Sequence, residues 1–163
     1  MPSPSPEAPS LPHALPRTLR ASPGFLLGKA AQQGAALVEQ VLQSLGLKAR
    51  HYGVLVALDE LGPRSQHELG DVLRIDRTTM VAIVDHLEGL GFVERRPQPE
   101  DRRSYQVWLT AAGSSALARA RGAVAAADAS LVERLSAPER RRLVRLLRTL
   151  NGLAYREADG DPA

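Results

Sequence analysis

Residues 65–110, SQHELGDVLRIDRTTMVAIVDHLEGLGFVERRPQPEDRRSYQVWLT, carry the pattern that decides the fold. Ser65 and Glu68 have the spacing of a capping box, which predicts the start of a short helix, and Asp76 is a favourable N-cap for a second helix. Apolar residues then recur at steps of three and four, which predicts that the second helix buries one face. These residues are Met80, Ile83, Val84, Leu87 and Leu90. The stretch therefore predicts two helices that meet at a short turn.

The opposite face of the second helix is small, partly polar and free of long acidic side chains near its beginning. Its residues are Arg77, Thr78, Thr79, Val81 and Ala82, followed by Asp85. Such a face fits the major groove of DNA, where an arginine can bond a guanine and apolar groups can meet thymine methyl groups. We therefore predict that the first five contact base edges. An ordinary solvated helix face is the alternative.

Two short runs with the properties of β-strands follow the second helix, which Gly89 and Gly91 end. FVERR at 92–96 begins the first strand, and SYQVWLT at 104–110 alternates apolar and other residues with the period of two that a half-buried strand shows. The runs predict a hairpin, or wing, beside the helix. Its arginines are Arg95 and Arg96 in the first strand and Arg102 and Arg103 at the tip. This cluster suits DNA phosphates or the minor groove, although it could be only a charged hairpin.

Residues 76–113 resemble the winged helix-turn-helix core of the MarR (multiple antibiotic resistance regulator) family. The matching motifs are Asp85 to Leu87, GFVERR at 91–96, Asp101-x-Arg103, and Val107-x-Leu109-Thr110-x-x-Gly113. Several motifs in order are more specific than any one of them alone. In the resembling proteins, the positions of Val81 and Ala82 often carry polar side chains that contact bases. The resemblance also implies that Asp101 holds the shape of the wing so that Arg103 reaches DNA.

The resemblance implies a homodimer of winged helix-turn-helix subunits that a small ligand tunes. We expect a sequence-specific transcriptional regulator, a ligand-responsive repressor that binds an inverted-repeat operator in double-stranded DNA. The ligand is expected to be aromatic or anionic and to lie between the dimer helices and the winged module. Candidate pocket residues are Arg17, Arg20, His51 and Tyr52. The alternative is that Tyr52 belongs to the core and both arginines are solvated.

The flanking segments predict one domain with helical ends. Proline and serine dominate residues 1–16, which predicts a disordered arm before a single domain over 17–163. Apolar stripes mark long helices at about 24–45 and 111–155, and leucines on this scale require a partner surface. We expect these helices to form a homodimer around a winged module at about 51–110. The expected fold is mainly α with a small β-hairpin.

Composition limits the function further. The chain has 163 residues, a net charge of +3 and a pI near 9.8, so the clustering of arginines says more than the total charge. It has no cysteine, which excludes disulfides, thiolate metal sites and a cysteine-based peroxide sensor. It has no apolar run long enough for a membrane span and no signal-peptide pattern, so we expect a cytoplasmic protein without a membrane partner.

The sequence favours neither a metal site nor an enzyme. The histidines His51, His67 and His86 have no helical spacing of three or four between them, so we expect no metal. We also expect no cofactor and no catalytic residue, because the sequence lacks a nucleophile elbow and a phosphate-binding glycine loop. The alternative from another class is a helical dimerisation or adaptor protein whose basic hairpin binds acidic proteins. It explains the terminal helices but not the helix-turn-helix pattern.

Overall fold

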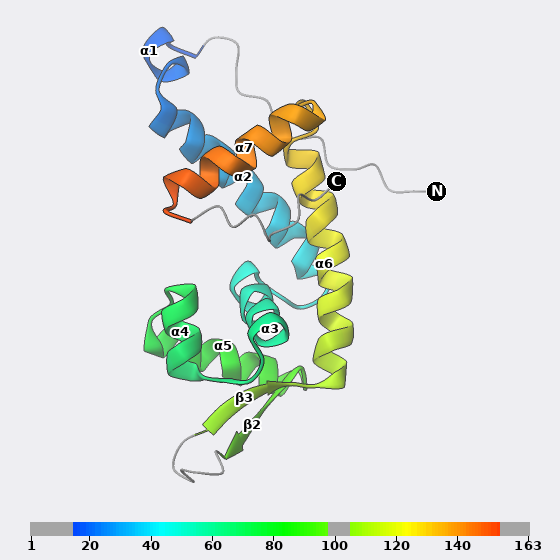
Figure 1. The fold of residues 1–163 in the computed structure, drawn as a ribbon. Helices are drawn as coiled ribbons and strands as arrows, with labels where there is room; N and C mark the ends of the chain where they lie inside the picture. Colours follow the sequence, from blue (N-terminus) through cyan, green and yellow to red (C-terminus); the bar gives the residue numbers. More distant parts are fainter. Residues whose placement is uncertain (1–14, 98–104, 154–163) are drawn as a thin grey trace, which may run out of the picture.

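The computed structural model describes residues 15–97 and 105–153, and Figure 1 shows a mainly helical chain with one small sheet. The helices are α1 (Arg17–Arg20), α2 (Pro23–Gln43), α3 (Ala49–Leu61), α4 (Gln66–Leu73), α5 (Arg77–Gly89), α6 (Ala111–Leu131) and α7 (Ala137–Leu150). The strands are β1 (Arg64–Ser65), β2 (Val93–Pro97) and β3 (Tyr105–Leu109). The predicted fold class is confirmed. Residues 1–14 of the predicted arm lie outside the described residues.

The helix-turn-helix begins and turns where the sequence predicts. The Glu68 amide donates to Ser65 Oγ at 3.3 Å and the Ser65 amide donates to Glu68 Oε2 at 2.8 Å, which completes the capping box of α4. Asp76 Oδ1 accepts the Thr79 amide at 3.0 Å and caps α5. A Cβ on Gly70 of α4 would lie 2.9 Å from the backbone oxygen of Ile75 in the turn that follows, so the close approach of this turn to α4 requires glycine there.

The core lies beneath α5. Four of the five apolar residues predicted for its inner face are fully buried, namely Met80, Ile83, Val84 and Leu87. Leu90 is different: it is 40% exposed, because α5 ends at Gly89 and Leu90 is only its C-cap. The buried face packs with residues of α3, α4, α6 and the sheet into one cluster. This packing leaves the other face of α5 on the surface.

The sheet has one strand more than the sequence predicted. β2 pairs with β3 in antiparallel register from Val93 opposite Leu109 to Pro97 opposite Tyr105. β1 pairs with the other edge of β3, so the strand order is β1-β3-β2. α3, α4, α5 and this sheet together form a winged helix-turn-helix.

Thr110 joins the wing to the long helix α6. It separates the end of β3 from the start of α6, caps α6 by accepting the Gly113 amide at 3.0 Å, and donates its hydroxyl to the Gly91 carbonyl at 2.7 Å. Its amide donates to the Phe92 carbonyl at 3.1 Å. A Cβ on Gly113 would lie 2.0 Å from that carbonyl, so glycine is required here too. The end of α5, the wing and α6 are therefore tied together at one residue.

α2 and α7 lie at the end of the molecule opposite the wing, and α6 runs from the wing to that end (Figure 1). α2 packs along α6. On α7, Val144, Leu146 and Leu150 are half or more exposed, with Leu150 at 72%. The apolar face predicted for the last helix thus lacks a covering surface among the described residues. No helix in the described part of the chain is long and apolar enough to span a membrane.

Candidate DNA-binding surface

The outer face of α5 is the exposed ridge that the sequence predicted. Arg77, Thr78, Val81 and Ala82 are exposed and Thr79 is half-buried. Hydrogen bonds from the Thr79 side chain and amide lower the pKa of Asp76, which therefore stays ionised as the cap at the beginning of the ridge. The ridge begins at a helix N-terminus and carries a cation, two hydroxyls and two small apolar side chains. Such a surface can present both hydrogen-bond donors and methyl groups to base edges.

On one flank of this ridge, Arg95 of β2 clamps the wing to α5. Its guanidinium pairs with Asp85 at 2.5 Å and with Glu88, and its amide donates to Glu88 Oε1 at 3.0 Å. Burial lowers the pKa of Arg95, but the hydrogen bonds and charges of Asp85 and Glu88 outweigh it, so the pKa lies above its usual range. The side chain is only 24% exposed. This placement favours a structural role over the DNA contact expected from the sequence.

The other wing residues are placed differently. Arg96 is exposed, lies over the Trp108 ring with its guanidinium 4.6 Å from the ring centroid, and donates from Nε to Glu94 at 2.7 Å. It therefore stays at the surface of the wing. Asp101, Arg102 and Arg103 lie outside the described residues.

On the other flank of the ridge, two histidines connect α5 to the start of α3. The rings of His51 and His86 stack with their centroids 4.4 Å apart. Nδ1 of His51 accepts the Lys48 amide at 3.2 Å, and Nε2 of His86 lies 3.2 Å from the Gly46 carbonyl oxygen, to which it can donate. Burial is the largest cause that lowers the pKa of His51, and the nearby His86, Arg50 and Lys48 lower it further. The pKa is about 4, so this ring is neutral at pH 7.

Sequence reasoning missed this pair, because it compared the histidines only at helical spacings and the contact joins two separate helices. The pair is not a metal site by itself. Within the described residues, no group of three or more His, Asp or Glu side chains could hold a metal ion.

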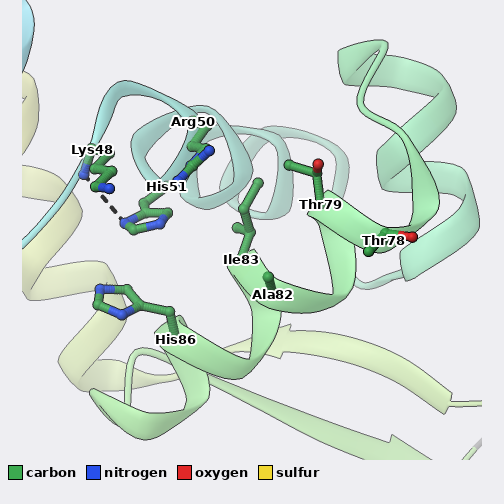
Figure 2. Close-up of a pocket in the computed structure, with 8 residues that line it drawn as sticks. All are labelled: Lys48, Arg50, His51, Thr78, Thr79, Ala82, Ile83 and His86. Atoms are coloured by element: carbon green, nitrogen blue, oxygen red, sulfur yellow. Dashed lines mark hydrogen bonds between the residues drawn. The ribbon is translucent and has the colours of Figure 1, made fainter.

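Two hollows border the histidine pair. The first, which we call the α3 groove, has a volume of about 380 Å³ and lies between Lys48 and Arg50 at the start of α3 and Thr78, Thr79 and Ala82 on α5 (Figure 2). The second, the α2 hollow, has a volume of about 560 Å³. Its wall includes Glu39, Gln40 and Gln43 of α2 as well as Lys48 and both histidines.

The four predicted pocket residues do not come together in one subunit. His51 lines both hollows. Tyr52 instead packs against the core, where burial raises its pKa and Arg121 and Asp128 of α6 lie near it. Arg17 and Arg20 are exposed on α1, at the opposite end of α2 from these hollows (Figure 1). Of the four, only His51 therefore lines a described cavity between α2 and the winged module.

Known proteins carry the same arrangement of elements. A family model described as the MarR family matches residues 45–104, which hold the helix-turn-helix and the first strand of the wing, β2. The HTH-type transcriptional repressor Rv2887 of Mycobacterium tuberculosis is 32% identical over 127 residues, which are 78% of this chain and 91% of that one. The chain belongs to the MarR family. MarR-family proteins are DNA-binding transcriptional regulators and not enzymes.

Further relatives and solved structures extend the comparison. The putative transcriptional regulatory protein for the hcr operon of Thauera aromatica is 37% identical over 112 residues, or 69% of this chain, and the chain spans 65% of that relative's length. Among solved structures, the repressor CouR bound to a 23-mer DNA duplex superposes with a TM-score of 0.77 at 32% identity, over 83% of this chain and 96% of that one. CouR from Rhodococcus jostii RHA1 bound to p-coumaroyl-CoA gives 0.72 at 26% identity, over 87% of this chain and 100% of that one.

Proposed function

We propose that the chain is a repressor that binds an inverted-repeat operator as a homodimer and releases it when a small ligand binds. The observation that carries the DNA-binding part is the bare ridge of α5, which the wing flanks on one side and the α3 groove on the other. CouR, a repressor with the same fold, has been solved on a DNA duplex, which supports the same use of the ridge here.

The residues assigned to base contact are those of the ridge. They are Arg77, Thr78, Thr79, Val81 and Ala82. Arg77 is the residue able to make a bidentate bond to guanine, so Arg77→Ala should relax the preference at one position of each half-site at a cost of about 1 to 3 kcal/mol. For the wing we assign backbone or minor-groove contact to Arg96, Arg102 and Arg103, with Asp101 holding the shape of the wing.

The homodimer is supported by the uncovered apolar surface at the end opposite the wing. Residues 17–163 act as one domain in this proposal, with the winged module at about 51–110 and the flanking helices as the dimer interface. Leu26 and Leu27 of α2 are 40% and 45% exposed, and Leu146 and Leu150 of α7 are 50% and 72% exposed. Burying such side chains against a second subunit stabilises the pair by about 25 cal/mol for each Å² of apolar surface removed from water.

The ligand part rests on the α2 hollow, which lies between a helix of the dimer end and the winged module. Its volume of about 560 Å³ falls within the range of small-molecule sites. His86 of α5 lines it, so a molecule bound there would touch the end of the helix that enters DNA. A ligand shifts the equilibrium only if it binds better to the arrangement that does not fit the operator. CouR with p-coumaroyl-CoA shows that a relative of this fold binds an aromatic, anionic molecule.

The test begins with selection of bound fragments from a random duplex pool. Two-fold related α5 helices should select inverted repeats whose half-sites lie about 10 base pairs apart, the spacing of successive major grooves. Asymmetric or single half-sites would contradict the dimer. Sedimentation of Leu146→Glu/Leu150→Glu should show monomers or insoluble chain. Arg141→Gln/Arg145→Gln on the same helix lowers the net charge by the same amount and is the control. Phenolic carboxylates are then tested for release of the selected duplex, and a compound that stabilises the chain without weakening DNA binding would contradict the switch.

A further inference from the structure

We propose that the α3 groove binds the phosphodiester backbone of DNA, on the strand that borders the side of the major groove away from the wing. Lys48 and Arg50 would be the cations that contact phosphate. This inference rests on the proposed function, because it requires the ridge of α5 to enter a major groove.

The geometry follows from the two flanks of α5. Thr78, Ala82 and His86 recur at steps of four, so they form one stripe, and this stripe faces the start of α3. Asp85 and Glu88 lie on the wing flank, where Arg95 holds them. A helix in the major groove has one sugar-phosphate strand on each side of it, because the groove is only about 12 Å wide. The wing therefore meets one strand, and the α3 groove meets the other.

The chemistry of the α3 groove suits an anion. Lys48 and Arg50 are exposed, and neither has an ion-pair partner among the described residues. None of the described residues that line the groove is acidic, and the opposite wall carries Thr78, whose hydroxyl can donate to a phosphate oxygen, whereas the Thr79 hydroxyl already bonds Asp76. Glu39 accepts the Ala49 amide at 3.1 Å but lines the α2 hollow and not this groove. Cations that no carboxylate neutralises remain available for DNA.

The groove is also held in place relative to the ridge. His51 accepts the Lys48 amide and stacks on His86, which belongs to α5 and lies within bonding distance of the Gly46 carbonyl (Figure 2). The backbone that carries Lys48 and Arg50 is therefore fixed to the helix that reads DNA. A phosphate contact made from a fixed backbone sets the depth and direction in which α5 enters the groove.

The experiment compares wild-type chain with Lys48→Gln/Arg50→Gln on a random-sequence duplex of roughly 30 base pairs, which spans successive major grooves. The variant should bind roughly tenfold or more weakly, and the plot of log affinity against log salt should be shallower by about 0.9 for each phosphate that the variant no longer neutralises. Arg141→Gln/Arg142→Gln, which removes two exposed cations from α7, should leave the slope unchanged. Lys48→Arg/Arg50→Lys, which keeps both charges, should retain the wild-type slope.

Thermal unfolding of every variant in the same buffer shows whether the fold is kept. A wild-type slope in Lys48→Gln/Arg50→Gln would overturn the assignment of the groove while leaving the proposed function intact. Wild-type chain that binds no duplex would overturn both. A third outcome would also overturn the assignment. If inorganic phosphate stabilised the wild type but not Lys48→Gln/Arg50→Gln, and both bound DNA with the same salt slope, the groove would be a site for small anions.

Discussion

The two flanks of α5 use cationic residues in opposite ways. On the wing flank, Arg95 is paired with Asp85 and Glu88 and is mostly covered, so its charge is used inside the molecule. On the α3 flank, Lys48 and Arg50 have no carboxylate partner among the described residues, and the contact that holds this flank together is a stack of two imidazoles. A cluster of arginines in a sequence therefore does not show which of them face DNA. The fold pairs and covers Arg95, whereas Arg96 stays at the surface although it pairs with Glu94.

The largest effect is expected from the pH dependence of the α3 flank. The pKa of His51 is about 4 in the folded chain against 6.5 in the unfolded chain. Between these values the unfolded chain binds a proton that the folded chain does not, so stability present above pH 6.5 is lost as the pH falls toward 4. Each unit of difference between the two pKa values corresponds to about 1.36 kcal/mol, and solvent screening reduces this. The free energy of unfolding should therefore drop by about 2 to 3 kcal/mol.

Urea unfolding at a series of pH values from 7 to 4 measures this drop. His51→Gln should remove most of the slope between pH 6.5 and pH 5, a range above the titration of ordinary carboxyl groups. His67→Gln is the matched control, because the His67 side chain is 87% exposed and should leave the slope unchanged. Equal slopes in wild type and His51→Gln would mean that the buried ring does not resist protonation.

The second effect concerns the clamp on the wing flank. Arg95→Ala leaves Asp85 and Glu88 without their shared cation and should lower the free energy of unfolding by about 2 kcal/mol, since breaking a partly covered ion pair costs more than breaking an exposed one. Chemical denaturation measures the change. If Arg95→Ala kept its stability but lost affinity for every duplex by the same factor, Arg95 would be a phosphate contact. The contrast between the two flanks would then fail.

The smallest effect is expected at the neighbouring position on the same strand. Arg96→Ala removes an exposed cation–π contact with Trp108 and an exposed ion pair with Glu94, and it should change the free energy of unfolding by only about 0.5 kcal/mol. It should instead weaken binding to every duplex and reduce the salt dependence, if Arg96 meets the DNA backbone. A loss of stability as large as that of Arg95→Ala would show that both arginines serve the fold.

The local features of the fold were predictable from the sequence because they depend on short spacings. The capping box at Ser65 and the cap at Asp76 are formed as predicted, and four of five inward residues of α5 are buried. β1 was not predictable, since a strand of two residues has no periodicity and exists only because β3 lies beside it.

The candidate site was predictable in part. The exposed ridge from Arg77 to Ala82 is where the period of α5 places it. The pairing of Arg95 and the stack of His51 on His86 each join two elements that are brought together by the packing of the whole core, so neither leaves a local signal. The same limit applies to Tyr52, whose aromatic ring suggested a ligand pocket but which packs toward α6.

The junction at Thr110 connects the long helix α6 mechanically to the wing and to the end of α5. α6 has 21 residues and is therefore about 30 Å long, and its first residue follows directly on the residue that holds the wing to the end of α5. A tilt of about 5° at the far end of such a rod moves the near end by about 3 Å, which is close to the rise of one base pair. Because Thr110 bonds both to Gly91 after α5 and to Gly113 of α6, a tilt of this rod is passed to α5. In the homodimer proposed above, the angle between the two α6 rods would therefore set the distance between the two α5 helices.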